Sequence, residues 1–361
     1  MANEIYFDRG KNGASQFDPE AFQKRFNEIR NESENKRNPP PAPQKPQPEA
    51  PKAAKQQPKK KKKHVFLKLI AVLLALVLLA AGALAGAAVY VTADYEPIEL
   101  KANTAVSESS LMGNPAVTNI LLMGIDTKDV HAKTRSDSMI LMSVDNVHSA
   151  LKLSSFMRDM YVTVPGHGDT KLTHACAYEG PQLTVDTIEL NFGIRIDGYI
   201  KIGYGIFVEL VNGIGGITVS EIDATESQAL AREGVNIEPG TNIHLNGHQA
   251  LQYCRIRKGQ SDFQRTERQR EAITLIIKQA LKTNPVKLLK LARSIVPQVE
   301  SSLSKADIIK LAVKAVPCLL KDITQLQIPA EGTWSSGTRD GMSVLVVDKD
   351  ANKKALKDFI Y

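Results

Sequence analysis

Hydrophobic residues beyond position 117 fall into short apolar runs separated by longer amphipathic segments. The first three runs, 119–124, 138–144 and 151–156, have the length and composition of buried strands. Further strands are expected at 195–202, 217–220, 323–328 and 343–347. Helical periodicity predicts helices at 184–190, 204–212, 245–253, 264–283, 286–295, 305–320 and 352–360. The stretch 221–241 is a polar excursion in which no element is expected.

The alternation of strands and helices predicts one α/β domain at 117–361. Its central sheet is expected to be mostly parallel or mixed, with helices covering both faces. The helix at 264–283 has a strongly apolar side, on which Ile273, Ile276 and Ile277 lie. Ligands of open α/β sheets bind beyond the carboxyl ends of strands, so polar residues next to the strands are candidates for a site.

One apolar run is far longer than a strand. Residues 69–93 carry no charge, and at about 1.5 Å per residue a helix of this length crosses a bilayer core. Five lysines at 59–63 precede it, and Asp94 and Glu96 follow it. The positive-inside rule therefore predicts a single-pass type II protein of the cell membrane, with a transmembrane helix at 64–93 and a cytoplasmic N-terminus. A cleaved signal peptide is the alternative, but the preceding tail is too long for one.

The flanks of this helix complete the predicted domain organisation. Residues 1–63 are rich in proline, glutamine and lysine, which predicts a disordered, basic cytoplasmic tail with a short helix at 17–29. Residues 94–116 are expected to form a juxtamembrane stalk. Gly82 and Gly86 form a GxxxG pattern, which favours a homo-oligomer paired through the transmembrane helix.

Charge and cysteine content narrow the class of protein further. The chain carries 46 Lys and Arg against 39 Asp and Glu, an excess of +7. Residues 1–63 alone hold 15 basic and 8 acidic residues, the same excess, so the rest of the chain has a net charge of zero and no nucleic-acid partner is expected. Cys176, Cys254 and Cys318 are too few for a disulfide framework. Unpaired thiols are expected, with a Cys176–Cys254 bridge as the alternative.

The densest chemistry lies in residues 254–269. Charged residues crowd this segment: Arg255, Arg257, Asp262, Arg265 and Arg268. Arg255 and Arg257 share a face of an extended chain, whereas Arg265 and Gln269 share a face of a helix. Clustered guanidinium groups suit phosphate or pyrophosphate. A solvated loop with surface ion pairs is the alternative.

Two aspartates stand at the ends of the first two predicted strands. Asp126 and Asp137 are hard oxygen ligands, and together they suit a Mg²⁺ ion that also binds phosphate oxygens. The alternative is structural, with Asp126 capping a turn and Asp137 paired with Arg135. Arg135 and Arg158 would neutralise a pyrophosphate and stabilise charge on it as a leaving group.

Other motifs add little chemistry. Lys171 and His174 lie in the segment KLTHACAY, where Lys171 is a candidate phosphate ligand and a lone histidine is more often a structural donor. No GxSxG, HExxH or P-loop pattern occurs in the sequence. Serine hydrolases, zinc peptidases and Walker-type ATPases therefore have no support.

Six segments, in order, resemble the motifs of the LytR-CpsA-Psr family. They are NILLMGID (119–126), TRSDSMILMSVD (134–145), SFMRDMYVTVPG (155–166), KLTHACAY (171–178), LNGHQALQYCRIR (245–257) and DFQRTERQ (262–269). The resemblance covers about residues 117–281, and the predicted anchor and basic tail agree with the family's topology. Met157, Cys176 and Glu179 depart from the family's usual residues.

The resemblance implies an extracytoplasmic α-β-α sandwich with an apolar pocket for a polyprenyl chain. It implies a phosphotransferase that uses Mg²⁺ to move an anionic glycopolymer, such as wall teichoic acid or capsule, from polyprenyl pyrophosphate to peptidoglycan. The implied catalytic residues are Asp126, Arg135, Asp137 and Arg158. Phosphate binding is assigned to Arg135, Arg158, Lys171, Arg255, Arg257, Arg265 and Gln269, and metal binding to Asp126 and Asp137.

Two other functions are open at this stage. A polyprenyl-pyrophosphate pyrophosphatase would use the same residues without an acceptor. A membrane-anchored regulatory protein of envelope synthesis would use the basic tail. The predicted topology disfavours the regulator, because it places the arginine clusters across the membrane from the genome.

Overall fold

The structure, a computed structural model, describes residues 7–9, 15–17, 86–87, 89–257, 262–319 and 321–361. The chain divides into two units, 1–66 and 67–361. In the first unit, β1 (Phe7–Arg9) pairs antiparallel with β2 (Ser15–Phe17). The helix expected at 17–29 and most of the expected transmembrane segment lie outside the described residues. Within the described ranges, no helix has both the length and the apolar character needed to cross a membrane.

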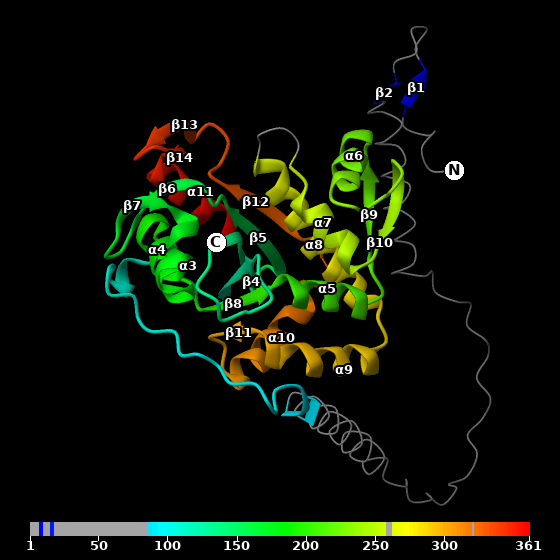
Figure 1. Cartoon of the computed structure of the whole chain (residues 1–361), viewed down its shortest axis with the longest axis horizontal. Coiled ribbons are helices and arrows are strands. Elements are labelled where there is room, and N and C mark those ends of the chain that lie inside the picture. The colour runs from blue at the N-terminus through cyan, green and yellow to red at the C-terminus, as the bar shows by residue number, and fades with distance from the viewer. Residues whose placement is uncertain (1–6, 10–14, 18–85, 88, 258–261, 320) are drawn as a thin grey trace, which may run out of the picture. The chain divides into compact units, whose positions relative to one another are not determined.

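The second unit is built on a six-stranded sheet (Figure 1). Its strands are, in spatial order, β11 (Glu300–Ser301), β8 (Gly198–Gly203), β3 (Val117–Ile125), β4 (Ser136–Asp145), β5 (Ala150–Phe156) and β12 (Thr324–Ile328). The pairs β3–β8 and β5–β12 are parallel, and the other three pairs are antiparallel. The sheet is therefore mixed, which was one of the two expected forms, and it is not mostly parallel. Short loops connect β3, β4 and β5, and only antiparallel strands can be joined in this way.

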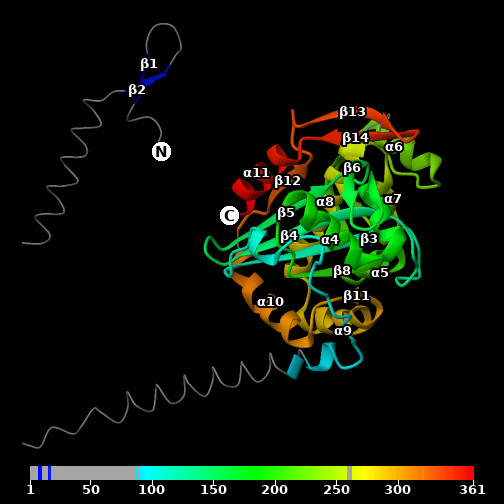
Figure 2. The same ribbon diagram turned by 90° about the vertical axis from the view of Figure 1, so that its left-hand side faces the viewer.

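Helices cover both faces of this sheet, as predicted (Figures 1 and 2). One face carries α3 (Leu172–Glu179), α4 (Pro181–Phe192) and α11 (Lys349–Ile360). The other carries α5 (Tyr204–Gly213), α8 (Asp262–Lys282) and α10 (Lys305–Cys318), with α9 (Pro285–Ile295) packed on α5. Short 3-10 turns lie at Glu108–Ser110 and Val296–Gln298.

The alternation of side chains along β3 assigns its residues to the two faces. Leu121 and Met123 are fully buried in the larger core, together with residues of α3 and α4. Leu122, between them, points to the opposite face, because successive strand residues face opposite sides of a sheet. This second face is the one that forms the cavity described below.

Smaller sheets and one helix flank the main sheet. A four-stranded sheet has the order β13 (Trp334–Arg339), β14 (Met342–Val347), β6 (Met160–Val164), β7 (Gly168–Lys171). A two-stranded ribbon joins β9 (Ile217–Ile222) to β10 (Gly240–Leu245). No helix or strand was expected within 221–241, but this expectation is wrong. This stretch holds α6 (Ala224–Arg232), which starts at a capping box formed by Asp223 and Glu226.

Two further details of the sequence prediction change in the structure. The helix expected at 245–253 is α7 (Gly247–Arg255), because β10 continues to Leu245 and the Asn246 side chain accepts a hydrogen bond from the Gln249 amide. Residues 94–116 do not stand away from the domain. Tyr95 is buried, and its hydroxyl donates to the Leu303 carbonyl at 2.6 Å.

The three cysteines are free and buried, which confirms the expectation of unpaired thiols. Burial raises the pKa of Cys176, and it raises the pKa of Cys254 to about 12. The Cys176–Cys254 disulfide that the sequence left open is absent. Both thiols therefore stay protonated at neutral pH and have the low reactivity of structural cysteines.

Candidate active site

A β-bulge brings the two candidate aspartates to the same edge of the sheet. Gly124 pairs with Ser138, but the next residue, Ile125, pairs with Ser136. Asp137 is therefore the extra residue of a bulge, and a bulge re-aims a side chain that regular alternation would point elsewhere. Because β3 and β4 are antiparallel, the end of one strand lies beside the start of the other. Asp126 and Asp137 consequently line the same cavity.

The cavity has a volume of about 810 Å³ and lies between the sheet, α5 and α8. Its floor is a row of three apolar side chains in register on neighbouring strands. Leu122 of β3 lies opposite Ile140 of β4 and Ile200 of β8. Phe207 and Leu210 of α5 also line it. The lining is mainly apolar, so the cavity suits a hydrocarbon chain.

One face of helix α8 lines the cavity, and its residues change from polar to apolar along the helix. Arg265, Gln269, Ile273, Ile276 and Ile277 all line the cavity. Their spacing of three, four or eight residues places them on one side of a helix. The polar residues come first, near the helix N-terminus, and the isoleucines follow. A single helix face thus joins a cationic mouth to an apolar interior.

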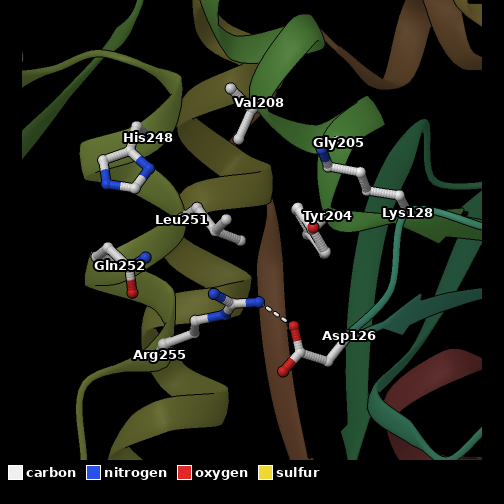
Figure 3. A pocket seen from close by; sticks show the side chains of 9 residues that line it. All are labelled: Asp126, Lys128, Tyr204, Gly205, Val208, His248, Leu251, Gln252 and Arg255. Carbon is white, nitrogen blue, oxygen red and sulfur yellow. Dashed lines mark hydrogen bonds and ion pairs between the residues drawn. The ribbon is translucent and has the colours of Figure 1, made fainter. Parts of the chain in front are cut away.

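Arg255 lies on one side of the mouth. Figure 3 shows its side chain turned toward Asp126. Its guanidinium donates to the Asp126 carboxylate and lies 5.5 Å from the centre of the Tyr204 ring. Tyr204 follows the end of β8, and Asp126 follows the end of β3, its parallel neighbour. The carboxyl ends of these two strands therefore position both partners of Arg255.

Arg158 holds the other side of the mouth together. Its Nη1 donates to Asp137 Oδ1 at 2.5 Å, and its Nε donates to Asp262 Oδ2 at 2.9 Å. Burial acts to lower the pKa of Arg158, but its hydrogen bond to the Asp137 carboxylate and the charge of Asp262 outweigh burial, and the pKa is raised. Arg158 is thus a fixed cation that links β4 to the N-terminus of α8.

Arg265 and Gln269 carry polar atoms whose hydrogen-bonding capacity is unused. Arg265 Nε and Gln269 Oε1 are buried, and neither has a hydrogen-bond partner among the described residues. Burial lowers the pKa of Arg265. The negative charge of Asp262 opposes this shift, and the positive charges of Arg158 and Arg257 add to it. Unsatisfied buried polar atoms are rare and call for a ligand or water. Because both residues line the cavity, the Arg265 Nε donor marks where an oxygen of an anionic head group fits, whereas the Gln269 Oε1 acceptor suits a hydroxyl group or a water molecule beside it.

The remaining predicted residues are spread over different positions. Arg257 lines the cavity but is half exposed, with Nε 3.9 Å from Asp262 Oδ1. Lys171 lies outside the cavity lining and is tied to Asp159 at 2.7 Å. Arg135 is exposed and makes no ion pair within the described part of the chain, so its structural pairing with Asp137 is wrong.

Two residues of the sequence motifs have structural roles. Arg268 is buried on another face of α8, where it donates to Glu226 at 3.1 Å and to the Ile256 carbonyl at 2.8 Å. His174 Nδ1 and Thr170 Oγ1 share a hydrogen bond of 2.8 Å. Burial, followed by the charges of Arg135 and Lys171, lowers the pKa of His174, so its imidazole is neutral at pH 7.

Sequence reasoning missed three parts of the mouth. Tyr204 was treated only as the start of a helix. It directly follows a strand, and the same position after a strand was the reason for selecting Asp126. Arg232 and Glu233, in and after α6, line the cavity from the stretch where no element was expected. Asp262 was noted as one of the charged residues of 254–269, and not as the group that holds Arg158 and Arg265 in place.

The donor set fits a Mg²⁺ ion shared with a phosphorylated ligand. Asp126 and Asp137 line the same cavity, and the carboxylates of both are accessible to a ligand. Each carboxylate pairs with an arginine and retains lone pairs for a cation. In the described ranges no group of three or more His, Cys, Asp or Glu residues is arranged to hold a metal. Magnesium typically takes one or two carboxylates and completes its shell with water and phosphate oxygens.

An apolar cavity with a mouth of guanidinium groups and carboxylates is typical of a protein that binds an amphiphilic phosphate. The family comparison agrees with this class: the sequence model of the LytR_cpsA_psr family matches residues 87–359. The chain belongs to this family, and the resemblance of the six segments is confirmed.

Several relatives have similar sequences. Teichoic acid transferase TagT of Bacillus subtilis is 33% identical over 226 residues, which are 59% of this chain and 69% of TagT. Teichoic acid transferase TagU of Halalkalibacterium halodurans is 37% identical over 166 residues, and the match spans about half of that relative, 53%. Regulatory protein MsrR of Staphylococcus aureus is 29% identical over 252 residues, 68% of this chain and 75% of MsrR.

Solved structures share the fold. A structure of TagT bound to LI-WTA matches with a TM-score of 0.61 and 27% identity, covering 73% of this chain and 97% of TagT. A structure of TagT with bound octaprenyl pyrophosphate lipid matches with a TM-score of 0.57 and 26% identity, covering 73% and 99%. The mixed α/β fold of this chain is therefore the fold of these proteins.

Proposed function

We propose that the protein transfers a phosphorylated glycopolymer from a polyprenyl-pyrophosphate carrier to peptidoglycan. The observation that carries this proposal is the α8 face, on which the unpartnered Arg265 Nε and Gln269 Oε1 stand directly before the isoleucines of the apolar cavity. A pyrophosphate bound there has its lipid in the cavity. The relatives named as teichoic acid–peptidoglycan transferases, and the TagT structure with octaprenyl pyrophosphate, support the same reading.

In this reaction an acceptor hydroxyl attacks the phosphorus that bears the glycan. A new P–O bond forms to the acceptor, the phosphoanhydride bond breaks, the hydroxyl proton is released, and polyprenyl monophosphate leaves. Arg255, Arg257 and Arg265 bind the pyrophosphate and stabilise the charge that grows on the leaving phosphate. Arg158 holds Asp137 and Asp262 in position. Asp126 and Asp137 would hold a Mg²⁺ ion, and the chemistry such an ion would supply is neutralisation of charge on phosphate oxygens.

Product analysis separates a transferase from a pyrophosphatase. The full-length chain is incubated with a short polyprenyl-pyrophosphate-linked glycan, with and without soluble peptidoglycan oligomers. We expect the glycan phosphate on the oligomers and polyprenyl monophosphate as the second product. Release of free glycan phosphate at the same rate, whether or not oligomers are present, would instead identify a pyrophosphatase.

Substitution of Asp137 tests the proposed metal site. Asp137→Asn keeps the shape of the side chain but removes the charge that attracts Mg²⁺. We expect weaker Mg²⁺ binding by titration calorimetry and a loss of turnover that chelator reproduces in the parent protein. We expect little change in thermal stability, because the asparagine side-chain oxygen at this position can still accept the hydrogen bond from Arg158, and Arg158 keeps its ion pair with Asp262.

The matched control for this substitution is Asp129→Asn. Asp129 is an exposed aspartate of the loop that precedes β4, and it does not line the cavity. We expect parental Mg²⁺ affinity and turnover from it. An Asp137→Asn protein with full activity at limiting Mg²⁺ would exclude the metal site.

We also propose that the protein is a type II membrane protein with its catalytic domain outside the cytoplasm. The five lysines before the apolar run and the acidic residues after it support this orientation. A reporter fused after Tyr361 that is active only outside the cytoplasm is the expected result. Cytoplasmic activity of the fusion would refute the orientation, and a freely secreted, cleaved domain would favour the signal peptide.

A further inference from the structure

Two consecutive helices, α9 and α10, leave large apolar side chains exposed to solvent. Val286 of α9 is 62% exposed, and Val313 and Val316 of α10 are 58% and 60% exposed. Val313 and Val316 are three residues apart, so they lie on one side of α10. Figures 1 and 2 both show α9 and α10 at one end of the second unit. Single exposed apolar residues are common on proteins, so these valines do not by themselves indicate a partner.

The same part of the chain is strongly basic. Residues 282–321 hold eight Lys and Arg against two Asp and Glu, a net charge of +6, whereas the whole chain after the basic tail is neutral. On α9, the exposed Lys290 lies one helical turn after Val286. On α10, the exposed Lys310 lies one turn before Val313. Basic and apolar groups on one side of a helix are typical of helices that lie on a membrane of anionic lipids.

The chain enters the domain at these two helices. Arg293 of α9 forms an ion pair with Asp94, and its guanidinium lies 5.7 Å from the centre of the Tyr90 ring. Lys305, the first residue of α10, donates a hydrogen bond to the Ala93 carbonyl at 3.4 Å. The end of the long apolar run is thus bound to α9 and α10. If that run spans a bilayer, both helices lie at the surface of the bilayer.

Helix α9 also forms part of the wall of the apolar cavity. Ile295, its last residue, and Val299 line the cavity together with Ile276 and Ile277 of α8. Val286 and Ile295 are nine residues apart, and at about 100° per residue they lie on opposite sides of α9. One helix therefore separates the cavity from the exposed valine. A bilayer on the outer side of α9 would lie next to the cavity.

We propose that the outer sides of α9 and α10 rest on a bilayer that contains anionic lipids. The residues of this α9–α10 surface are Val286, Lys287, Lys290, Lys310, Val313 and Val316. The valines insert among the lipid head groups, and the lysines bind lipid phosphates. The inference rests on the proposed membrane anchor. It goes beyond the proposed transferase reaction, because it fixes how the domain lies on the membrane from which its lipid substrate comes.

The test places a fluorescent label on the α9–α10 surface. The full-length chain is reconstituted in nanodiscs of phosphatidylcholine and phosphatidylglycerol, with an environment-sensitive fluorophore on Val313→Cys or on Val286→Cys. The three native cysteines are buried, so they do not compete for the label. We expect spin-labelled lipid to quench the fluorophore at both positions, because both side chains reach the lipid head groups.

Gln228→Cys is the matched control. Gln228 is exposed on α6, and both views place α6 at the opposite end of the second unit from α9 and α10 (Figures 1 and 2). We expect no quenching of a label at this position in the same nanodiscs.

Removing the charge of the surface should release it from the membrane. Each lysine near an anionic membrane strengthens binding about fivefold, so Lys287→Gln, Lys290→Gln and Lys310→Gln combined should lower the ratio of membrane-bound to free surfaces about 10²-fold. Quenching at Val313→Cys should then fall toward the control value. None of the three lysines lines the apolar cavity, so turnover of a detergent-dispersed donor should stay unchanged, whereas turnover of a donor embedded in the nanodisc should fall.

Labels that stay unquenched at both positions in anionic nanodiscs would overturn the proposal. A blue shift without quenching, equal in anionic and neutral nanodiscs, would also contradict it and would indicate a second copy of the chain on this surface. Failure of the membrane anchor is a separate result, in which the parent chain does not remain with the nanodiscs and the proposal fails with it. Failure of the transferase function is distinguishable too, because quenching is measured without substrate.

Discussion

Replacing Arg255 or Arg257 by lysine is expected to reduce turnover about 10²–10³-fold while leaving the protein folded. A lysine keeps the positive charge but loses the planar fork that binds two phosphate oxygens at once. Removing one such charge-stabilising donor from an active site typically costs about this factor in rate. The measurement is turnover of a short polyprenyl-pyrophosphate-linked glycan by the full-length variants, beside a thermal melt.

Arg195→Lys is the matched control. Arg195 is exposed to a similar extent as Arg257, 51% against 54%, and pairs with Glu108 and Asp197 outside the apolar cavity. Exposed ion pairs contribute about 0–1 kcal/mol, so this variant should keep both turnover and melting temperature. If Arg255→Lys and Arg257→Lys behave like the control, the two arginines are surface residues and the phosphate site is wrongly placed.

The second large effect concerns the lipid. Each buried methylene group contributes about 0.8 kcal/mol, so shortening the polyprenyl chain by a few isoprene units should weaken binding by more than 10²-fold. Leu122→Asn should reduce the preference for long chains, because Leu122 lies in the apolar row on the cavity floor. The KM values of long-chain and short-chain donors, measured in the parent and the variant, give the comparison.

Leu345→Asn is the control for this substitution. Leu345 is also a half-buried strand leucine, but it packs on the larger core and does not line the cavity. It should lower stability without changing the ratio of the two KM values. Equal KM values for short and long chains in the parent protein would show that the cavity does not hold the lipid.

The apolar runs were sufficient to predict the strands that carry the site. The runs at 119–124, 138–144 and 151–156 became β3, β4 and β5, and the apolar side of 264–283 became the cavity face of α8. These elements follow from local patterns of side chains, which a single sequence contains. Asp126, Asp137, Arg255, Arg257, Arg265 and Gln269 were selected from sequence, and all six line one cavity.

The direction of the strands could not be predicted, and this changes why the aspartates meet. The sequence placed Asp126 and Asp137 together as neighbours at strand ends. They meet instead because β3 and β4 form an antiparallel hairpin and because a bulge turns Asp137 toward the cavity. Pairing direction and bulges depend on contacts between distant residues, which hydrophobic periodicity does not report.

Contacts between distant residues also decide which arginines of 254–269 line the cavity and which are buried elsewhere. Arg268 follows the pattern of its neighbours in sequence, but it faces Glu226 of α6, a helix that was not expected. The capping box of α6 was present in the sequence as Asp223 and Glu226, although the segment lacks a clear apolar stripe. The side of α8 that each arginine occupies follows from the helix geometry, whereas its partner follows from the tertiary fold.

We propose that a polyprenyl pyrophosphate binds in the apolar cavity, with its pyrophosphate at the mouth. The most direct measurement is a crystal structure of this protein with that lipid bound. We predict the hydrocarbon chain between the Leu122–Ile140–Ile200 row and the isoleucines of α8, and a pyrophosphate oxygen within hydrogen-bond distance of Arg265 Nε. A lipid bound outside this cavity, or a pyrophosphate that makes no contact with Arg255, Arg257 or Arg265, would contradict the account.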